Sequence, residues 1–176
     1  MVKIDVSKEG TEKIKRALSA LSGRALYQAV GSAGKRAARH AATVGAKKMR
    51  EVYNIKAGVA KSRMAVKTER PLETIIRIEG GTEPVQNFRG TAVRKTGIFV
   101  SIKKGSGGII PRSFTQGGSF LMREGVERYP LKGIYGPSVP QMFWENIVLE
   151  AAMEAGAEMY EKRIIHEVER RIGGEI

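Results

Sequence analysis

The sequence is poor in the residues that form cross-links and many catalytic centres. It contains no cysteine, which excludes both a disulfide framework and a thiolate metal site. Asp5 is the sole aspartate, and the two histidines, His40 and His166, stand near opposite ends of the chain. Both histidines fall in predicted charged helices, so we interpret them as solvated residues. The sequence therefore predicts no catalytic residue, no bound metal and no cofactor.

Long apolar stretches are also missing. No window offers the roughly 18 uncharged apolar residues that a membrane-spanning helix needs. The opening residues, MVKIDVSKEG, lack the apolar core of a secretory signal. We therefore expect no membrane partner, and the lack of cysteine is consistent with assembly in a reducing cytoplasm. A chain of 176 residues with 41% hydrophobic residues is long enough for one domain with a real core.

Positive charge is the strongest feature of the composition. The chain has 31 lysines and arginines against 18 acidic residues, which gives a net charge of +13. The excess lies in residues 1–130, with 26 basic and 10 acidic side chains, whereas residues 131–176 carry 5 basic and 8 acidic ones. Such a basic chain is expected to meet nucleic acid, an anionic membrane surface or acidic protein partners. The opposite signs of its two parts also suit head-to-tail contact between copies.

The first 50 residues predict two helices. Ile14, Leu18 and Leu21 recur at helical spacing within residues 8–22, and a longer helix is expected over residues 24–50. The apolar stripe of the longer helix consists mostly of small residues: Leu26, Val30, Ala33, Ala37, Ala41 and Val44. Because small side chains permit close backbone approach, we expect this helix to press tightly on another element.

The middle of the chain predicts strands. Residues 54–70 form a basic connector with a short helix near 58–65, and residues 83–95 have no periodic pattern and are expected to form a loop. β-branched runs between turn signals predict strands at 72–79, 97–103, 109–116 and 119–123, with a short fifth near 131–135.

The C-terminal part predicts one long helix. Ser138 is a suitable N-cap, Pro140 fits the first turn, and the helix is expected to continue to about Arg171. The order of elements predicts a single α+β domain with N-terminal helices, an antiparallel sheet of about four to five strands and a long C-terminal helix. We divide it into a basic helical part (1–70), an antiparallel β region (71–136) and the C-terminal helix (137–176).

Two motifs with a chemical interpretation favour plain structural roles. The segment KKGSGG at 103–108 lacks the spacing of a phosphate-binding loop and leads into a strand, so it is interpreted as a hairpin turn. The last helix carries an acidic stripe without any pocket signal. We interpret this stripe as an exposed face or a contact to a basic neighbouring subunit. Its residues are Glu150, Glu154, Glu158 and Glu161.

The basic residues of the N-terminal part have three interpretations. They form a solvated face, contact DNA phosphates without sequence preference, or contact acidic protein surfaces. Aromatic residues do not alternate with them, which argues against base stacking on single strands. The candidate contact residues are Lys35, Arg36, Arg39, Lys47, Lys48, Arg50, Lys56, Lys61 and Arg63.

The segment 114–143, FTQGGSFLMREGVERYPLKGIYGPSVPQMF, resembles the minor tail protein Z family of tailed bacteriophages and prophages. The order of helices and strands agrees with that family over nearly the whole chain. The chain departs from one family member in lacking a long polybasic loop before the third strand, where it has only Lys103 and Lys104. The matching positions are Phe114, Gln116, Met122, Arg123, Arg128, Tyr129, Pro130, Leu131, Pro137, Pro140 and Phe143.

The resemblance implies a structural virion protein rather than an enzyme. Such proteins complete the head-proximal end of the tail, help to join it to the head, and form a ring of several copies around the DNA channel. The implied partners are other copies of the chain, the tail terminator or tail tube, the head–tail connector and double-stranded DNA. The implied location is the virion, with the bacterial cytoplasm as the place of assembly.

Two other classes of function fit the sequence less well. A nucleic-acid-binding protein that recognises phosphates without sequence preference would explain the charge, but no helix-turn-helix with a polar recognition helix and no zinc-ligand spacing is present. A small nuclease is disfavoured by the single aspartate and the scattered histidines.

Overall fold

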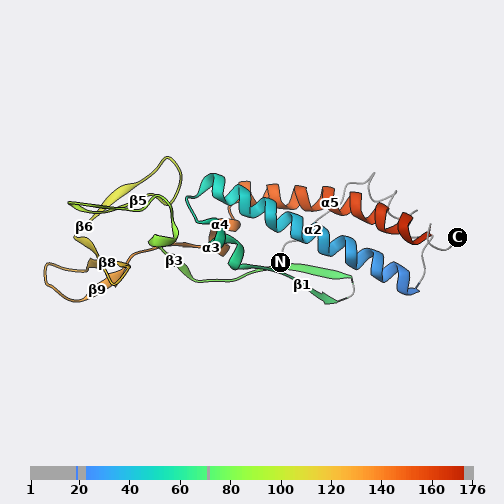
Figure 1. Ribbon diagram of the computed structural model, residues 1–176, viewed down its shortest axis with the longest axis horizontal. Coiled ribbons are helices and arrows are strands. Elements are labelled where there is room, and N and C mark those ends of the chain that lie inside the picture. Colours follow the sequence, from blue (N-terminus) through green and yellow to red (C-terminus); the bar gives the residue numbers. More distant parts are fainter. Residues whose placement is uncertain (1–18, 20–22, 71, 173–176) are drawn as a thin grey trace. The chain divides into compact units, whose positions relative to one another are not determined.

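The computed structural model describes residues 19, 23–70 and 72–172, and it has an α+β fold. Contacts divide the chain into two compact units. The helical unit draws on residues 1–45, 64–77 and 146–176, and the β unit on residues 46–63 and 78–145. Figure 1 shows the elements of both units, and each unit is described here by itself.

Two long helices build the helical unit. Helix α2, Gly23–Val52, confirms the helix expected over residues 24–50, and its first 23 residues belong to this unit. Helix α5, Asn146–Ile172, packs against it (Figure 1). Ala29 and Ala33 of α2 are fully buried against Ile164 and Val168 of α5. The small residues of α2 thus bring the two helices close together, as their spacing predicts.

A two-stranded sheet completes the described part of the helical unit. It pairs β1, Met64–Arg70, with β2, Glu73–Ile78, of which all but the last residue lies in this unit. A Cβ added at Gly34 of α2 would lie 3.5 Å from the hydroxyl oxygen of Thr74 on β2. The strand β2 confirms the strand expected at 72–79, whereas β1 falls where the sequence predicts a connector. The helix expected over residues 8–22 lies, apart from Ser19, outside the described residues.

The β unit contains three small antiparallel sheets, ordered β10–β3, β4–β5–β6 and β7–β8–β9. Val85, Ile98, Val100 and Ile134 form its buried core, against which Phe120 and Met122 pack from one side. The antiparallel α+β class is therefore confirmed, with the strands distributed over several small sheets. The elements are α3 Ala57–Ser62, β3 Thr82–Pro84, η1 Val85–Asn87, β4 Ala92–Arg94, β5 Gly97–Val100, β6 Gly108–Pro111, β7 Ser113–Gln116, β8 Ser119–Arg123, β9 Leu131–Gly133, β10 Tyr135–Ser138 and α4 Val139–Phe143.

The segment after α2 is threaded between two later parts of the β unit. The amide of Asn54 donates to the carbonyl of Ile102, and the carbonyl of Asn54 accepts from the amide of Arg89. The amide of Lys56 donates to the carbonyl of Asn87. Residues 53–56 therefore behave as a central strand, although only isolated bridges mark the pairing.

Three sequence predictions are wrong in detail. The loop expected at 83–95 contains β3, η1 and β4, and it buries Glu83, Val85 and Phe88 because these side chains face the core or an ion-pair partner. The strand expected at 109–116 is two strands, β6 and β7, because Arg112 adopts a φ of 58° and turns the chain into a different sheet. The short strand expected near 131–135 is likewise two, β9 and β10.

The prediction of a single C-terminal helix is also wrong. Ser138 caps α4 as expected, with Gln141 completing a capping box, but α4 ends at Phe143 and α5 begins only at Asn146. Glu145 lies in the break. Its carboxylate accepts hydrogen bonds from the Tyr53 hydroxyl and from Lys103 Nζ, the latter at 2.9 Å. These bonds hold Glu145 outside a regular helix.

Candidate interaction surfaces

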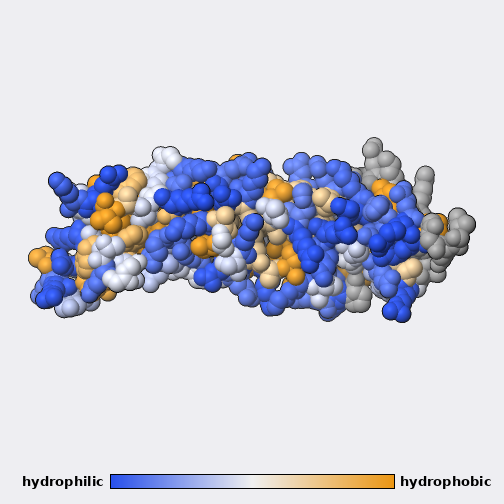
Figure 2. All heavy atoms as spheres, in the orientation of Figure 1, coloured by the Kyte–Doolittle hydropathy of each residue, from blue (hydrophilic) through white to orange (hydrophobic). Residues whose placement is uncertain are grey.

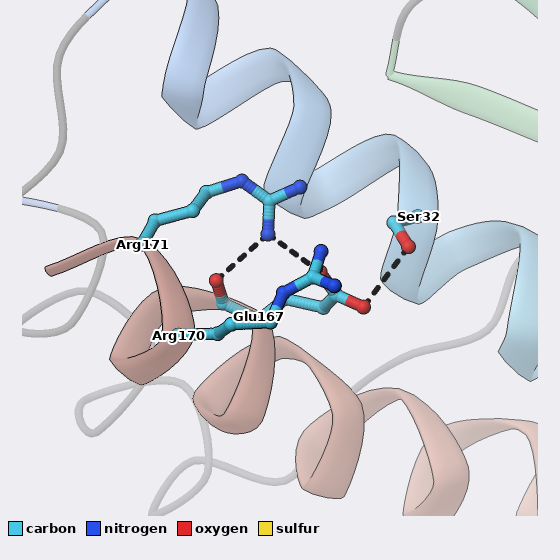
Figure 3. Close-up of polar contacts among 4 residues, drawn as sticks. All are labelled: Ser32, Glu167, Arg170 and Arg171. Atoms are coloured by element: carbon cyan, nitrogen blue, oxygen red, sulfur yellow. Dashed lines mark hydrogen bonds and ion pairs between the residues drawn. The ribbon is translucent and has the colours of Figure 1, made fainter. Parts of the chain in front are cut away.

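A buried polar cluster of the helical unit has a structural role. Figure 3 shows Glu167 of α5 between the two long helices, where it is only 2% exposed. Ser32 Oγ of α2 donates to Glu167 Oε1 at 3.1 Å. Arg170 and Arg171 bind Oε2 at 2.9 and 2.5 Å. All carboxylate oxygens are engaged within the protein, so this cluster fixes how α2 packs on α5.

The pKa of Glu167 is held below its ordinary value. Burial by itself raises this pKa, but the hydrogen bonds from Arg171 and Ser32 lower it. The positive charges of Arg170 and Arg171 lower it further. The carboxylate is therefore ionised in the folded protein at neutral pH.

A second buried carboxylate stabilises the β unit. Glu83 is fully buried, and its Oε1 accepts from Arg63 Nε at 2.9 Å while Oε2 accepts from Asn87 Nδ2 at 2.7 Å. Arg63 was a candidate contact to DNA or an acidic partner. Its charge is compensated here by Glu83, which makes it a poor ligand for an external anion.

Three candidate basic residues lie on the helical unit's part of α2. Lys35, Arg36 and Arg39 are exposed, and none of them belongs to an ion pair among the described residues. Arg39 lies four residues after Lys35 and three after Arg36, so it neighbours both side chains on the surface of the helix. Among the described residues, no carboxylate forms an ion pair with this group, which makes it a candidate site for an external anion.

The basic candidate residues in the β unit differ in exposure and in ion pairing. Lys47, Lys56 and Lys61 are exposed, and Arg50 is half-buried. Lys48 binds Glu51 at 3.0 Å, an ion pair with three-residue spacing on α2. Only part of the candidate set therefore presents uncompensated charge.

The acidic stripe lies on the outside of α5, as expected. Glu150, Glu154 and Glu158 are exposed, while Glu161 is half-buried. Glu158 has a weak ion pair with Lys162 at 3.9 Å, and neither Glu150 nor Glu154 belongs to an ion pair among the described residues. Like charges four residues apart repel each other, so this stripe destabilises the isolated helix slightly. An external cation would remove that repulsion.

The sequence analysis did not predict one further surface, which lies on the β7–β8–β9 sheet. On the β7–β8–β9 sheet, Phe120 and Met122 face the core. Side chains alternate along a strand, and directly paired residues share a face. Phe114, Leu121 and Leu131 must therefore lie on the opposite, outer face, together with Arg123, which pairs with Leu131.

An arginine and a tyrosine complete this outer face. The guanidinium of Arg123 lies 5.3 Å from the centre of the Phe114 ring, a distance typical of a cation–π contact. Gly133 pairs with Leu121, and a Cβ added there would meet the Tyr135 ring at 2.7 Å. The ring thus occupies the space that a side chain at Gly133 would need. We call Phe114, Leu121, Arg123, Leu131 and Tyr135 the outer β face.

A second arginine–aromatic pair lies beside this face in the connection between β8 and β9. Arg128 lies 5.7 Å from the ring centre of Tyr129, and Tyr129 is 63% exposed. Val126 in the same connection is 88% exposed. Figure 2 shows apolar surface among hydrophilic residues over the part of the molecule formed by β5 to β9. The alternation of side chains along β8 would predict the outer β face only if the sequence also showed which side of β8 packs against the core.

The two histidines lie on different helices. His40 is half-buried on α2 and His166 is exposed on α5. Within residues 19, 23–70 and 72–172, no group of three or more His, Cys, Asp and Glu residues could hold a metal ion. None of the helices in the described part of the chain contains an apolar stretch suited to crossing a membrane.

Comparison with protein-family models, with curated proteins and with solved structures finds no match to this chain. The features on which a function can be argued are therefore the α+β fold, the sequence segment 114–143 and the charged and apolar surfaces described above.

Proposed function

We propose that the chain is a structural, non-enzymatic virion protein of a tailed phage or prophage. In this role it is a minor tail or tail-completion protein at the head-proximal end of the tail. It acts in several copies around the DNA channel, between the tail tube or tail terminator and the head–tail connector. The host cytoplasm is its place of assembly.

The placement of the segment 114–143 is the observation that carries this proposal. The whole segment lies in the β unit and forms β7, β8, β9, β10 and α4 in succession. Its residues that resemble the minor tail protein Z family therefore belong to one compact part of the molecule. Arg123, Tyr129 and Leu131 among them contribute to exposed surface or to the outer β face. A segment of this kind suits contact with neighbouring proteins.

Localisation in particles tests the proposal. The gene is tagged in the prophage or phage that carries it, particles are purified after induction, and the tag is located by immunogold electron microscopy. Label at the head-proximal end of tails supports the proposal. Deletion of the gene is expected to leave heads and tails unjoined, and the wild-type gene in trans should restore complete particles. Normal particles after deletion, or label absent from them, would overturn it.

The alternative function is binding of nucleic acid through phosphates. The exposed group of Lys35, Arg36 and Arg39 favours it, because these side chains have no compensating carboxylate among the described residues. Within the tail such contacts would face DNA in the channel. Charge reversal at Lys47 and Lys48 helps to distinguish DNA contact from protein contact. Loss of tail assembly with unchanged DNA affinity would assign that part of α2 to an acidic protein neighbour.

A further inference from the structure

We propose that the outer β face of one copy of the chain binds the acidic stripe of α5 of a second copy. In this contact Arg123 and the neighbouring Arg128 approach Glu150 and Glu154, and the apolar side chains of the face pack against the exposed Ile147. The proposal extends the self-association suggested above and names its two surfaces. It does not depend on the assembly being a phage tail.

The composition of the outer β face favours a protein partner. Arginine, tyrosine and phenylalanine are enriched where protein interfaces carry most of their binding energy. Here two arginines lie on aromatic rings, with distances of 5.3 and 5.7 Å from guanidinium to ring centre. Tyr135 is 58% exposed, although its ring lies on a sheet face with several other apolar side chains. A partner that covers this face would remove apolar surface from water.

The charge of the face selects the partner. Lys132 is compensated by Glu124 at 3.7 Å, whereas Arg123 and Arg128 belong to no ion pair among the described residues. The matching surface must therefore present carboxylates beside apolar side chains. The stripe on α5 does so, because Ile147 is 49% exposed and precedes Glu150 and Glu154 at three- and seven-residue spacing on the same helical face.

The two surfaces differ, so the contact between copies is heterologous. Each copy offers the outer β face to one neighbour and the acidic stripe to another. A consequence is that charge changes on the two surfaces can be made in separate molecules. Self-association of such variants can therefore be tested without any other protein.

The first test exchanges charges. Variant X carries Arg123→Glu and Arg128→Glu, and variant Y carries Glu150→Lys and Glu154→Lys. Because like charges across an interface cost several kcal/mol, each variant alone should self-associate about 100-fold more weakly than the wild type. An equimolar mixture should associate as the wild type does, since X meets Y with opposite charges on both sides. The measurement is sedimentation equilibrium with circular dichroism as a check of folding.

A matched control carries Arg94→Glu and Lys95→Glu, which reverse the same number of charges at exposed positions of the β unit. This variant should self-associate like the wild type. A mixture of X and Y that associates no better than either alone would overturn the proposal. The same holds if X and Y separately retain wild-type association.

The second test remains informative if association is weak. The chain has no cysteine, so an introduced thiol is unique. Molecules with Arg128→Cys are mixed with molecules with Glu154→Cys and treated with a short bismaleimide at the highest attainable concentration. The mixed dimer should exceed both self-dimers at least about tenfold, whereas Lys95→Cys in place of Arg128→Cys should give no such excess. Statistical pairing in both mixtures would overturn the proposal, whatever the result of the particle-labelling experiment.

Discussion

Ser32 of α2 donates a hydrogen bond of 3.1 Å to the carboxylate of Glu167, which is buried on α5 135 residues later in the chain. The same carboxylate receives Arg170 and Arg171 from its own helix. Because buried charges are costly unless they are paired and hydrogen-bonded, this cluster stabilises only the packing in which all partners meet. It makes the arrangement of α2 and α5 sensitive to the charge of one side chain.

The first prediction concerns pH. The folded pKa of Glu167 lies below its ordinary value of 4.5, so the ionised carboxylate stabilises the fold above that value. This contribution is lost as the pH falls through the lower folded pKa. The wild type should therefore lose more unfolding free energy than Glu167→Gln between about pH 5 and pH 3. Urea denaturation at several pH values measures the difference.

The exposed neighbour Glu169 supplies the control for this experiment. Glu169→Gln removes one carboxylate on α5 without touching the buried cluster, and it should follow the wild-type pH dependence. At neutral pH, Glu167→Ala should lower the unfolding free energy by about 3 kcal/mol, since it leaves Arg171 without its carboxylate. Equal pH dependence of the wild type and Glu167→Gln would contradict the assigned role.

The second prediction separates Arg63 from the other basic candidates. Arg63→Ala leaves the carboxylate of Glu83 buried with only Asn87 as a side-chain donor, so it should reduce the unfolding free energy by about 2 kcal/mol. Lys61→Ala, two residues earlier at an exposed position of α3, should change stability by less than about 0.5 kcal/mol. Thermal or urea denaturation compares the two, and equal effects would show that the ion pair contributes little.

The third prediction concerns a glycine that the β unit requires. Gly97 has a φ of +147°, and a Cβ built there would lie 2.2 Å from the carbonyl oxygen of Ile110 on the paired strand. Gly97→Ala should therefore destabilise the protein by at least about 2 kcal/mol. Gly108→Ala on the same pair of strands meets no atom within 4 Å and should be nearly neutral. Similar losses for both variants would refute the steric explanation.

The fourth prediction concerns DNA. Binding to duplex DNA should be weak, independent of sequence and strongly dependent on salt. Each lost phosphate contact lowers the slope of log K against log salt by about 0.9, so Arg36→Glu with Arg39→Glu should reduce it by about 2. Fluorescence anisotropy over a series of salt concentrations gives the slope. Lys162→Glu, at an exposed position of α5, serves as the control, and an unchanged slope in the double variant would exclude Arg36 and Arg39 as phosphate contacts.

Regular elements could be predicted from the sequence, whereas interruptions and pairings could not. Helix α2 follows from its four-residue steps of small side chains, and Ser138 with Pro140 correctly predicts the start of α4. Nothing in the periodicity predicts the break after Phe143, because the Tyr53 and Lys103 contacts to Glu145 join residues far apart in the sequence. The strand β1 has exposed, mostly polar positions, and it therefore resembled a connector.

The candidate sites divide in the same way. The exposure of Glu150, Glu154 and Glu158 follows from helical spacing alone. The involvement of Arg63 with Glu83 depends on tertiary contacts between a connector and a presumed loop, and no local pattern carries that information. The outer β face required knowledge of which side of β8 the core covers, which only the pairing of three strands defines.

The central position of residues 53–56 also determines the order in which the β unit can fold. Asn54 bonds to Arg89 and Ile102, so its two backbone partners are synthesised 35 and 48 residues later. During translation this segment is made before either of its two partner segments. Its backbone groups therefore cannot form these hydrogen bonds until both partner segments have been made. Closing such long loops makes folding slow relative to a chain with local contacts. A nascent chain that ends before Ile102 therefore lacks one side of this pairing, and the β unit cannot complete the pairing until that residue has been made.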